Sequence, residues 1–221
     1  MVTYVTAEHN LGIEDRILKP NELVAKTADI IAGEMAERKI KKVSVVDLGC
    51  WKGNTLIYLA NRKDLHFYYL LGIDISGPYI DDFRKKIGEI NIPKEMKDRI
   101  GTLKGDITNL DSLVKGKADF FITLNVLQFL CEDEVSRVIK MLQRKTNPNG
   151  YNIIQALTPH SEKEESERLK RNSPIITPEY LQGFYLGWEI IHCDTIESAV
   201  RNHGQEDHKH YLTRFIARNI R

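Results

Sequence analysis

The amino-acid sequence predicts an α/β fold in which a mostly parallel sheet carries helices on both faces. Between residues 42 and 157, short β-branched and aromatic runs alternate with helix-like segments. Such alternation is typical of parallel strands joined by right-handed crossover helices. The chain has 221 residues, 42% of them hydrophobic, which is enough for one substantial core. We therefore expect a single domain over residues 1–221.

The chain is expected to begin with a helical cover over residues 1–40. Apolar residues recur at helical spacing over 21–39, with Asn21 as the N-cap, and this helix is expected to cover the sheet edge or a bound cofactor. The first strand is then predicted over 42–50, followed by a helix over 54–62.

Strands and helices continue to alternate after residue 62. Helices are predicted over 78–90, with Pro78 in the first turn, and over 132–145. Further strands are predicted over 67–76, 99–107, 118–126 and 151–157, the last entered through an Asn149-Gly150 turn.

Residues 158–177 interrupt this alternation with mixed charges and a proline near each end. Two interpretations are open: a solvated loop or short surface helix, and a lid over a substrate pocket. A short helix over 178–187 and two strands over 188–196 and 210–219 complete the expected elements.

Composition narrows the function classes. The formal charge is +1, from 32 Lys and Arg and 31 Asp and Glu, so nucleic acid is not favoured as a partner. The three cysteines, Cys50, Cys131 and Cys193, are far apart and form no CxxC pair, which suggests neither disulfides nor a zinc site. We expect no signal peptide, no membrane span and a cytoplasmic location.

Three acids stand at the ends of three successive predicted strands. In VVDLGCWKGNT, Asp47 ends the first strand, while Gly49 and Gly53 allow a sharp turn close to a ligand. In an open α/β sheet, ligands bind beyond these carboxyl ends. Asp74 ends the second strand and Asp106 the third. Each acid alone has a simpler interpretation as the cap of the next helix.

The same residues favour S-adenosylmethionine (SAM) over a dinucleotide. Trp51 and Asn54 stand where a GxGxxG loop needs glycine. Asp47 repels a pyrophosphate but suits the sulfonium and ammonium groups of SAM, which has no phosphate. Asp74 is placed to accept hydrogen bonds from the ribose hydroxyls, and Asp106 from the adenine amino group. Ile75 and Ile107 would sandwich the adenine ring.

The motifs VVDLGCWKGNT, LLGIDIS, GDITNL and ADFFITLNVLQFL resemble those of class I SAM-dependent methyltransferases. The resemblance covers residues 40–157 well and implies a Rossmann-like, seven-stranded sheet whose antiparallel last strand is inserted beside the fifth. It places Asp47 and Gly49 at the methionine end of SAM, and Asn125 beneath the cofactor, facing the substrate.

One departure from the family concerns Trp51, where these enzymes usually have glycine. Either the loop is slightly wider, or the indole packs over the cofactor or the N-terminal helix. Trp51 would then weaken SAM binding or form a wall of the pocket.

The segment before the last strand is rich in histidine. His203, His208 and His210 are candidate substrate-facing residues, able to act as a base or hold an oxyanion, and the last two would share one face of a strand. The alternatives are a polar hairpin loop and, less favoured, a metal site. The Ala217-Arg218 ending is loosely similar to small-molecule methyltransferases of the tellurite-resistance type.

The leading prediction is a methyltransferase that modifies a small molecule at oxygen, nitrogen or a chalcogen. The fourth-strand segment TLNVLQFL lacks the Asn-Pro-Pro-Tyr, Asp-Pro-Pro-Tyr and Pro-Cys motifs of nucleic acid enzymes. An RNA or protein methyltransferase and a non-catalytic partner subunit with the same fold stay open as alternatives. The oligomeric state is left open too.

Overall fold

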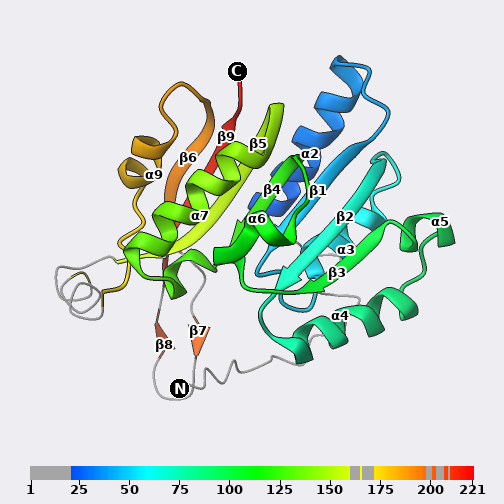
Figure 1. The fold of residues 1–221 in the computed structure, drawn as a ribbon, viewed down its shortest axis with the longest axis horizontal. Coiled ribbons are helices and arrows are strands. Elements are labelled where there is room, and N and C mark those ends of the chain that lie inside the picture. Colours follow the sequence, from blue (N-terminus) through cyan, green and yellow to red (C-terminus); the bar gives the residue numbers. More distant parts are fainter. Residues whose placement is uncertain (1–20, 160–164, 166–171, 198–200, 203–206, 209) are drawn as a thin grey trace.

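The structure, a computed structural model, describes residues 21–159, 165, 172–197, 201–202, 207–208 and 210–221. Two predicted segments are only partly described. Most of residues 158–177, interpreted above as a loop or a lid, lies outside the described residues, as does the first half of the 1–40 cover. The described part forms one seven-stranded sheet with helices on both faces (Figure 1).

The sheet has the order β3-β2-β1-β4-β5-β9-β6. The first five strands in sequence pair in parallel, and β9 lies antiparallel between β5 and β6. The predicted mostly parallel sheet with an antiparallel last strand inserted beside the fifth is therefore confirmed. The strands are β1 (Val43–Leu48), β2 (Phe67–Asp74), β3 (Ile100–Lys104), β4 (Ala118–Leu124), β5 (Thr146–Thr158), β6 (Glu189–Glu197) and β9 (Tyr211–Arg218).

Two hydrophobic clusters, one on each face of the sheet, form the core. The first lies beneath α2 (Glu22–Glu37), α3 (Asn54–Asn61) and α4 (Gly77–Glu89), and the second beneath α6 (Leu110–Leu113), α7 (Glu132–Lys145) and α9 (Pro178–Phe184). The buried strands are rich in β-branched and aromatic residues because both of their faces meet a helical layer. Helices thus lie on both faces of the sheet, as the sequence predicts.

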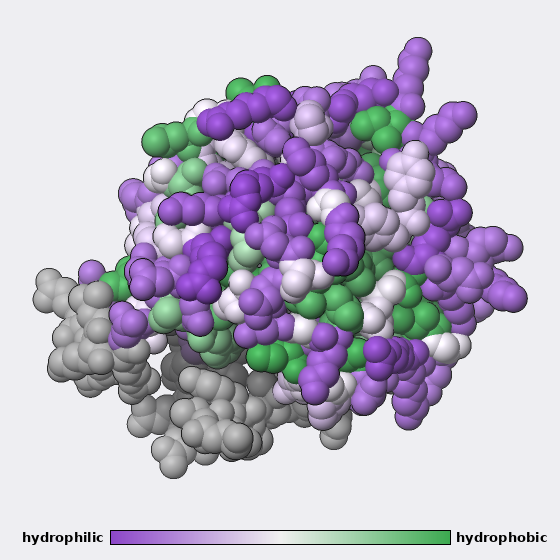
Figure 2. Space-filling view, viewed as in Figure 1, coloured by the Kyte–Doolittle hydropathy of each residue, from purple (hydrophilic) through white to green (hydrophobic). Residues whose placement is uncertain are grey.

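The cover on the second face is incomplete over β2 and β3. Side chains of these strands that face this layer, such as Tyr69, Leu71 and Leu103, are only partly buried. In the space-filling view, hydrophobic side chains reach the surface between polar ones over this part of the sheet (Figure 2).

The long helix α2 lies across the inner strands of the sheet. Its predicted N-cap is confirmed, since Asn21 Oδ1 accepts from the Val24 N–H at 2.9 Å. Leu23, Ala28 and Ile31 pack in the same cluster as residues of β1, β4, β5 and β9. The described half of the predicted cover therefore lies on the sheet face and not along its edge.

A buried arginine on β9 joins the start of α2, through the exposed Glu22, to the sheet. The guanidinium of Arg214 on β9, only 7% exposed, bonds both oxygens of Asp194 at 2.8 and 2.6 Å. It also reaches Glu22 at 2.6 Å. Arg214 lowers the pKa of the Asp194 carboxyl. At the other end of α2, the Tyr151 hydroxyl donates to Glu34 at 2.5 Å.

The fifth strand differs from its prediction, because pairing with β4 begins at Thr146 and not at Tyr151. The register shifts between Ala118 and Phe120, so residues 147–150 form a bulge. Asn149 has φ +61°, and the backbones of Asn149 and Gly150 bond that of Asn219 at 2.6 and 2.8 Å. The predicted turn residues thus shape a bulge within the strand.

Several short elements were missing from the sequence prediction. They are two 3-10 turns (Ile107–Asn109 and Leu127–Phe129), the helices α5 (Lys94–Lys97) and α6, and the two-stranded hairpin of β7 (Arg201–Asn202) and β8 (Asp207–His208). Such elements are too short for a periodic pattern. Among the described residues, no helix has the length and apolar character needed to cross a membrane.

The ion pairs of Arg214 predict the cost of removing Asp194. Asp194→Asn leaves a buried guanidinium short of its main partner, so we expect a loss of about 2–3 kcal/mol, less than a fully buried pair because Asp194 is 35% exposed. Because the pair lowers the folded-state pKa, its contribution is present at neutral pH and disappears as the pH falls through that pKa. Urea unfolding at pH 7 and pH 3 measures both effects.

Asp64→Asn is the matched control. Asp64 also bonds an arginine, Arg62, at 2.7 Å, but its side chain is 52% exposed. We expect a loss below about 1 kcal/mol. Equal losses for the two variants would contradict a larger contribution from the pair that contains the buried Arg214.

Candidate active site

The candidate site lies at the carboxyl edge of the sheet, where the strand order reverses. From β1 the chain adds β2 and β3 on one side, then β4 and β5 on the other. Neighbouring crossovers therefore diverge here, which is where open α/β sheets bind ligands. Asp47 lies in β1 beside Gly72 of β2 and Ile122 of β4, Asp74 ends β2, and Asp106 follows β3.

Asp47 is an acid held out of water. It is 2% exposed, and burial, followed by repulsion from Asp74, raises its pKa from 3.8 to about 8. Among the described residues, its carboxyl has no hydrogen-bond or ion-pair partner. A buried carboxyl without a partner is costly, and a cationic ligand would remove that cost.

Asp74 organises the loop that follows β1. Its Oδ2 accepts the Trp51 N–H at 2.9 Å, and its Oδ1 accepts the Ser76 N–H at 2.8 Å. Asp74 is 8% exposed. Each oxygen retains acceptor capacity beyond its one backbone bond, so the carboxylate can fasten the loop and still accept from ribose hydroxyls.

The loop itself has an alternating left-handed backbone. Gly49, Trp51 and Gly53 have φ of +68°, +49° and +73°. A Cβ at Gly49 would lie 2.2 Å from a Val126 methyl carbon, and a Cβ at Gly53 would lie 2.0 Å from the Phe83 ring. Both glycines are therefore required by conformation and by space.

Trp51 keeps the glycine-like backbone at some conformational cost. Its ring lies 6.0 Å from the Tyr79 ring in an edge-on arrangement, and the Lys52 amine lies 5.3 Å from the indole centroid. Tyr79 belongs to α4, which begins directly after β2. The indole is thus directed to the α4 side of the loop.

The two residues predicted to sandwich adenine differ in exposure. Ile75, directly after Asp74, is 67% exposed, as a stacking surface requires. Ile107 is 6% exposed and packs in the core with Ile73 and Leu110, so little of it faces solvent. Asp106 caps a 3-10 turn through Oδ1, which accepts from the Thr108 N–H and hydroxyl at 2.9 and 2.8 Å.

Both capping hydrogen bonds of Asp106 go to the same carboxylate oxygen, Oδ1. Its Oδ2 has no partner among the described residues. Capping and ligand binding are therefore compatible at Asp106, as they are at Asp74.

Asn125 belongs to a row of three hydrogen-bonded side chains whose middle member, Gln155, the sequence analysis did not predict. It follows β4 with φ +58°, its N–H donates to the Gln155 carbonyl at 2.7 Å, and its Oδ1 accepts from Gln155 Nε2 at 3.2 Å. Gln155 Oε1 accepts in turn from Asn21 at 3.4 Å. The sequence signal was Gln155 itself, a polar residue inside the apolar run of β5.

The three candidate histidines fall in the least described part of the chain. His203 lies outside the described residues, and of His208 only the backbone, in β8, is described. His210 is half-buried and precedes β9. The expectation that His208 and His210 share one strand face is wrong, because β8 ends at His208 and β9 begins at Tyr211.

The cysteines and the candidate metal ligands were also compared with the site. Cys50 is buried between the acids, and its pKa is raised by burial and then by Asp47 and Asp74. All three cysteines are free. Within the described part of the chain, no three His, Cys, Asp or Glu residues form a group suited to a metal ion.

Comparison with known proteins agrees with this geometry. A family model described as tellurite resistance protein TehB matches residues 14–209. A curated relative from Haemophilus influenzae, named probable S-adenosyl-L-methionine-dependent methyltransferase TehB, is 31% identical over 144 residues, 65% of this chain and 45% of the relative. The chain thus spans about half the length of the curated relatives it matches.

Solved structures show the same fold. The crystal structure of TehB from H. influenzae superposes with a TM-score of 0.66 at 22% identity, covering 89% of this chain and 61% of that one. Magnesium protoporphyrin IX methyltransferase from Synechocystis, with bound SAH, gives 0.62 at 16% identity, covering 97% and 90%. The chain therefore belongs to the TehB family, in the tellurite-resistance branch of the class I SAM-dependent methyltransferases.

Proposed function

We propose that this chain transfers a methyl group from SAM to a small-molecule acceptor. The observation that carries the proposal is the buried carboxyl of Asp47, which has no partner among the residues that the structure describes, with Asp74 close enough to raise its pKa. A site of this kind favours a cationic ligand without phosphates. The family and the named relatives point to the same ligand.

The residues at the site suit the charges and hydrogen-bonding groups of SAM. Asp47 and the close-packed Gly49 would hold the methionine end, and Asp74 would accept from the ribose. Ile75 and Asp106 Oδ2, which has no partner in the described part of the chain, would meet the adenine, with Gly53 and Trp51 bounding the loop. SAM supplies an electrophilic methyl group on a sulfonium.

The protein's own task is then to align the acceptor and exclude water. An acceptor lone pair forms the new bond to the methyl carbon as the carbon–sulfur bond breaks and its electron pair returns to sulfur. Asn125 is held by Gln155 at the edge where the acceptor would approach. A base is required only for an acceptor that must lose a proton, the role we propose for His203, His208 or His210. Three free thiols support a cytoplasmic setting.

Calorimetry against SAM, SAH and NAD tests the cofactor. We expect SAM and SAH to bind and NAD not to bind. Asp47→Asn should weaken SAM by roughly tenfold or more at pH 8.5, because it removes the charge that meets the ligand. Binding of NAD in the absence of SAM binding would exclude a methyltransferase.

The pH dependence identifies Asp47 more specifically. Since its pKa is about 8, SAM must displace a proton at lower pH, so affinity should rise by up to roughly tenfold per unit toward pH 8. The amino group of SAM titrates near pH 8 too, so the measure is the ratio of wild type to Asp47→Asn at each pH. A ratio that is constant from pH 6 to 9 would exclude this role.

Without ligand, the same substitution should stabilise the protein. The folded state keeps the Asp47 proton between about pH 4 and pH 8 while the unfolded state releases it, so wild-type stability falls as the pH rises through that window. Asp47→Asn removes this loss and should raise Tm by roughly 5 °C at pH 9. A lower Tm would mean that Asp47 is a structural residue.

Trp51→Gly tests whether the indole forms a wall of the cofactor site. The variant relieves the left-handed strain but loses the contact with Tyr79, two effects of about 1 kcal/mol each, so Tm should change little. We expect SAM affinity to fall by roughly tenfold. Tighter binding by the variant would show that the tryptophan hinders the cofactor.

The acceptor class is tested by measuring SAH formation. Purified protein and SAM are incubated with tellurite, selenite, small thiols and phenols, and in parallel with total RNA and with protein extract. We expect turnover in the small-molecule set, and a reduction of roughly tenfold or more in kcat for alanine at the substrate-facing histidine. Turnover with RNA or protein alone would replace the proposed acceptor, and full activity of all three alanine variants would remove the histidine role.

A further inference from the structure

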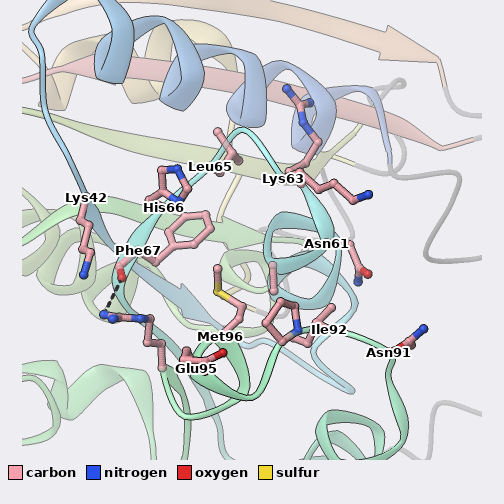
Figure 3. A pocket seen from close by; sticks show the side chains of 14 residues that line it. Lys42, Asn61, Lys63, Leu65, His66, Phe67, Asn91, Ile92, Glu95 and Met96 are labelled. Atoms are coloured by element: carbon pink, nitrogen blue, oxygen red, sulfur yellow. Dashed lines mark hydrogen bonds between the residues drawn. The ribbon is translucent and has the colours of Figure 1, made fainter.

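A cavity, seen from close by in Figure 3, lies at the edge of the sheet where β1 and β2 begin, opposite the edge where Asp47 and Asp74 lie. Its volume is about 430 Å³, within the range of small-molecule sites. All of its lining residues are described. Val43, next to the lining residue Lys42, is about 13 Å along β1 from Asp47. The cavity is therefore separate from the acids.

The floor of this cavity is apolar. Leu65, just before β2, and Phe67, its first residue, are each 1% exposed and lie deepest. Ile92 and Met96, from the segment around α5, are partly exposed. Figure 3 shows these side chains gathered around one space. An apolar surface of this kind holds the hydrocarbon part of a ligand.

The rim carries an excess of positive charge. Neither Lys42 nor Lys63 has an ion-pair partner among the described residues. Arg99 donates to the carbonyl oxygens of Phe67 and Tyr68 at 3.0 and 3.4 Å, so its charge is solvated but not neutralised. Arg62, by contrast, pairs with two acids, Asp29 and Asp64, so that this group of three carries a net negative charge.

One acid opposes these cations. Glu95 is the only Asp or Glu among the lining residues, against four Lys or Arg. With the acids that pair with Arg62 included, the group keeps a net positive charge of one. The lining itself therefore presents mainly cations to a ligand.

We propose that this cavity binds a small organic anion with an apolar body. The carboxylate, sulfonate or phosphate of the ligand would meet Lys42, Lys63 and Arg99, and its hydrocarbon part would cover the partly exposed Ile92 and Met96. Both halves are needed: a bare anion leaves these two side chains in water, and a neutral apolar molecule leaves the amines without a ligand charge to meet.

The test uses 8-anilinonaphthalene-1-sulfonate, an aromatic sulfonate whose fluorescence rises on transfer out of water. The protein is first saturated with SAH so that the cofactor site is blocked. We expect one binding site, competition by octanoate, and no competition by octylammonium or inorganic phosphate. Neutral octanol should compete at least roughly tenfold more weakly than octanoate.

Charge variants then locate the probe. The double variant Lys42→Glu/Lys63→Glu should weaken binding by roughly tenfold or more, and Glu95→Lys should strengthen it. Lys140→Glu is the matched control. Lys140 is an exposed lysine on α7 and does not line the cavity, so this variant should leave binding unchanged. Circular dichroism confirms that each variant folds.

Two outcomes would overturn the proposal. Equal competition by octanol and octanoate would show that charge plays no part. Binding that is unchanged in both the double variant and Glu95→Lys would place the probe elsewhere on the protein.

Discussion

The site depends on one carboxyl group held out of water at the end of a central strand. Asp47 is buried because β1 is covered on both faces and flanked by β2 and β4, and none of the described residues pairs with its carboxyl. Such burial disfavours the charged carboxylate, and a cationic ligand would offset that cost. Asp74 adds to the effect, because its negative charge also raises the pKa of Asp47.

The charges of the molecule are distributed along its strands. Acids gather where β1, β2 and β3 end, and cations gather where β1 and β2 begin. A formal charge of +1 conceals this separation. Each end of the same two strands therefore presents a different surface to small molecules, and α2 is fastened over the sheet by the buried guanidinium of Arg214 without drawing on either set.

The sequence predicted the parts of the fold that repeat. Strand and helix periodicity located the seven sheet strands, and the strand ends located Asp47, Asp74 and Asp106. It could not predict the bulge at residues 147–150, because Asn149-Gly150 also suits a simple turn and the bulge depends on distant Asn219. Gln155 was missed for the same reason: its partners, Asn21 and Asn125, are brought together only by the packed sheet. Burial of Ile107 likewise depends on neighbours from other elements.

Cys50 illustrates what two buried acids do to a neighbour. Its sulfur lies against the backbone of β2, where a Cβ added at Gly72 would be only 2.8 Å from it. Burial, and then the negative charges of Asp47 and Asp74, raise the pKa of the thiol and so disfavour the thiolate. Oxidants and soft electrophiles attack thiolates and not thiols. A member of a tellurite-resistance family thus carries a cysteine beside Asp47 and Asp74 in an unreactive form, so that alkylating reagents should modify the half-buried Cys131 and Cys193 long before Cys50.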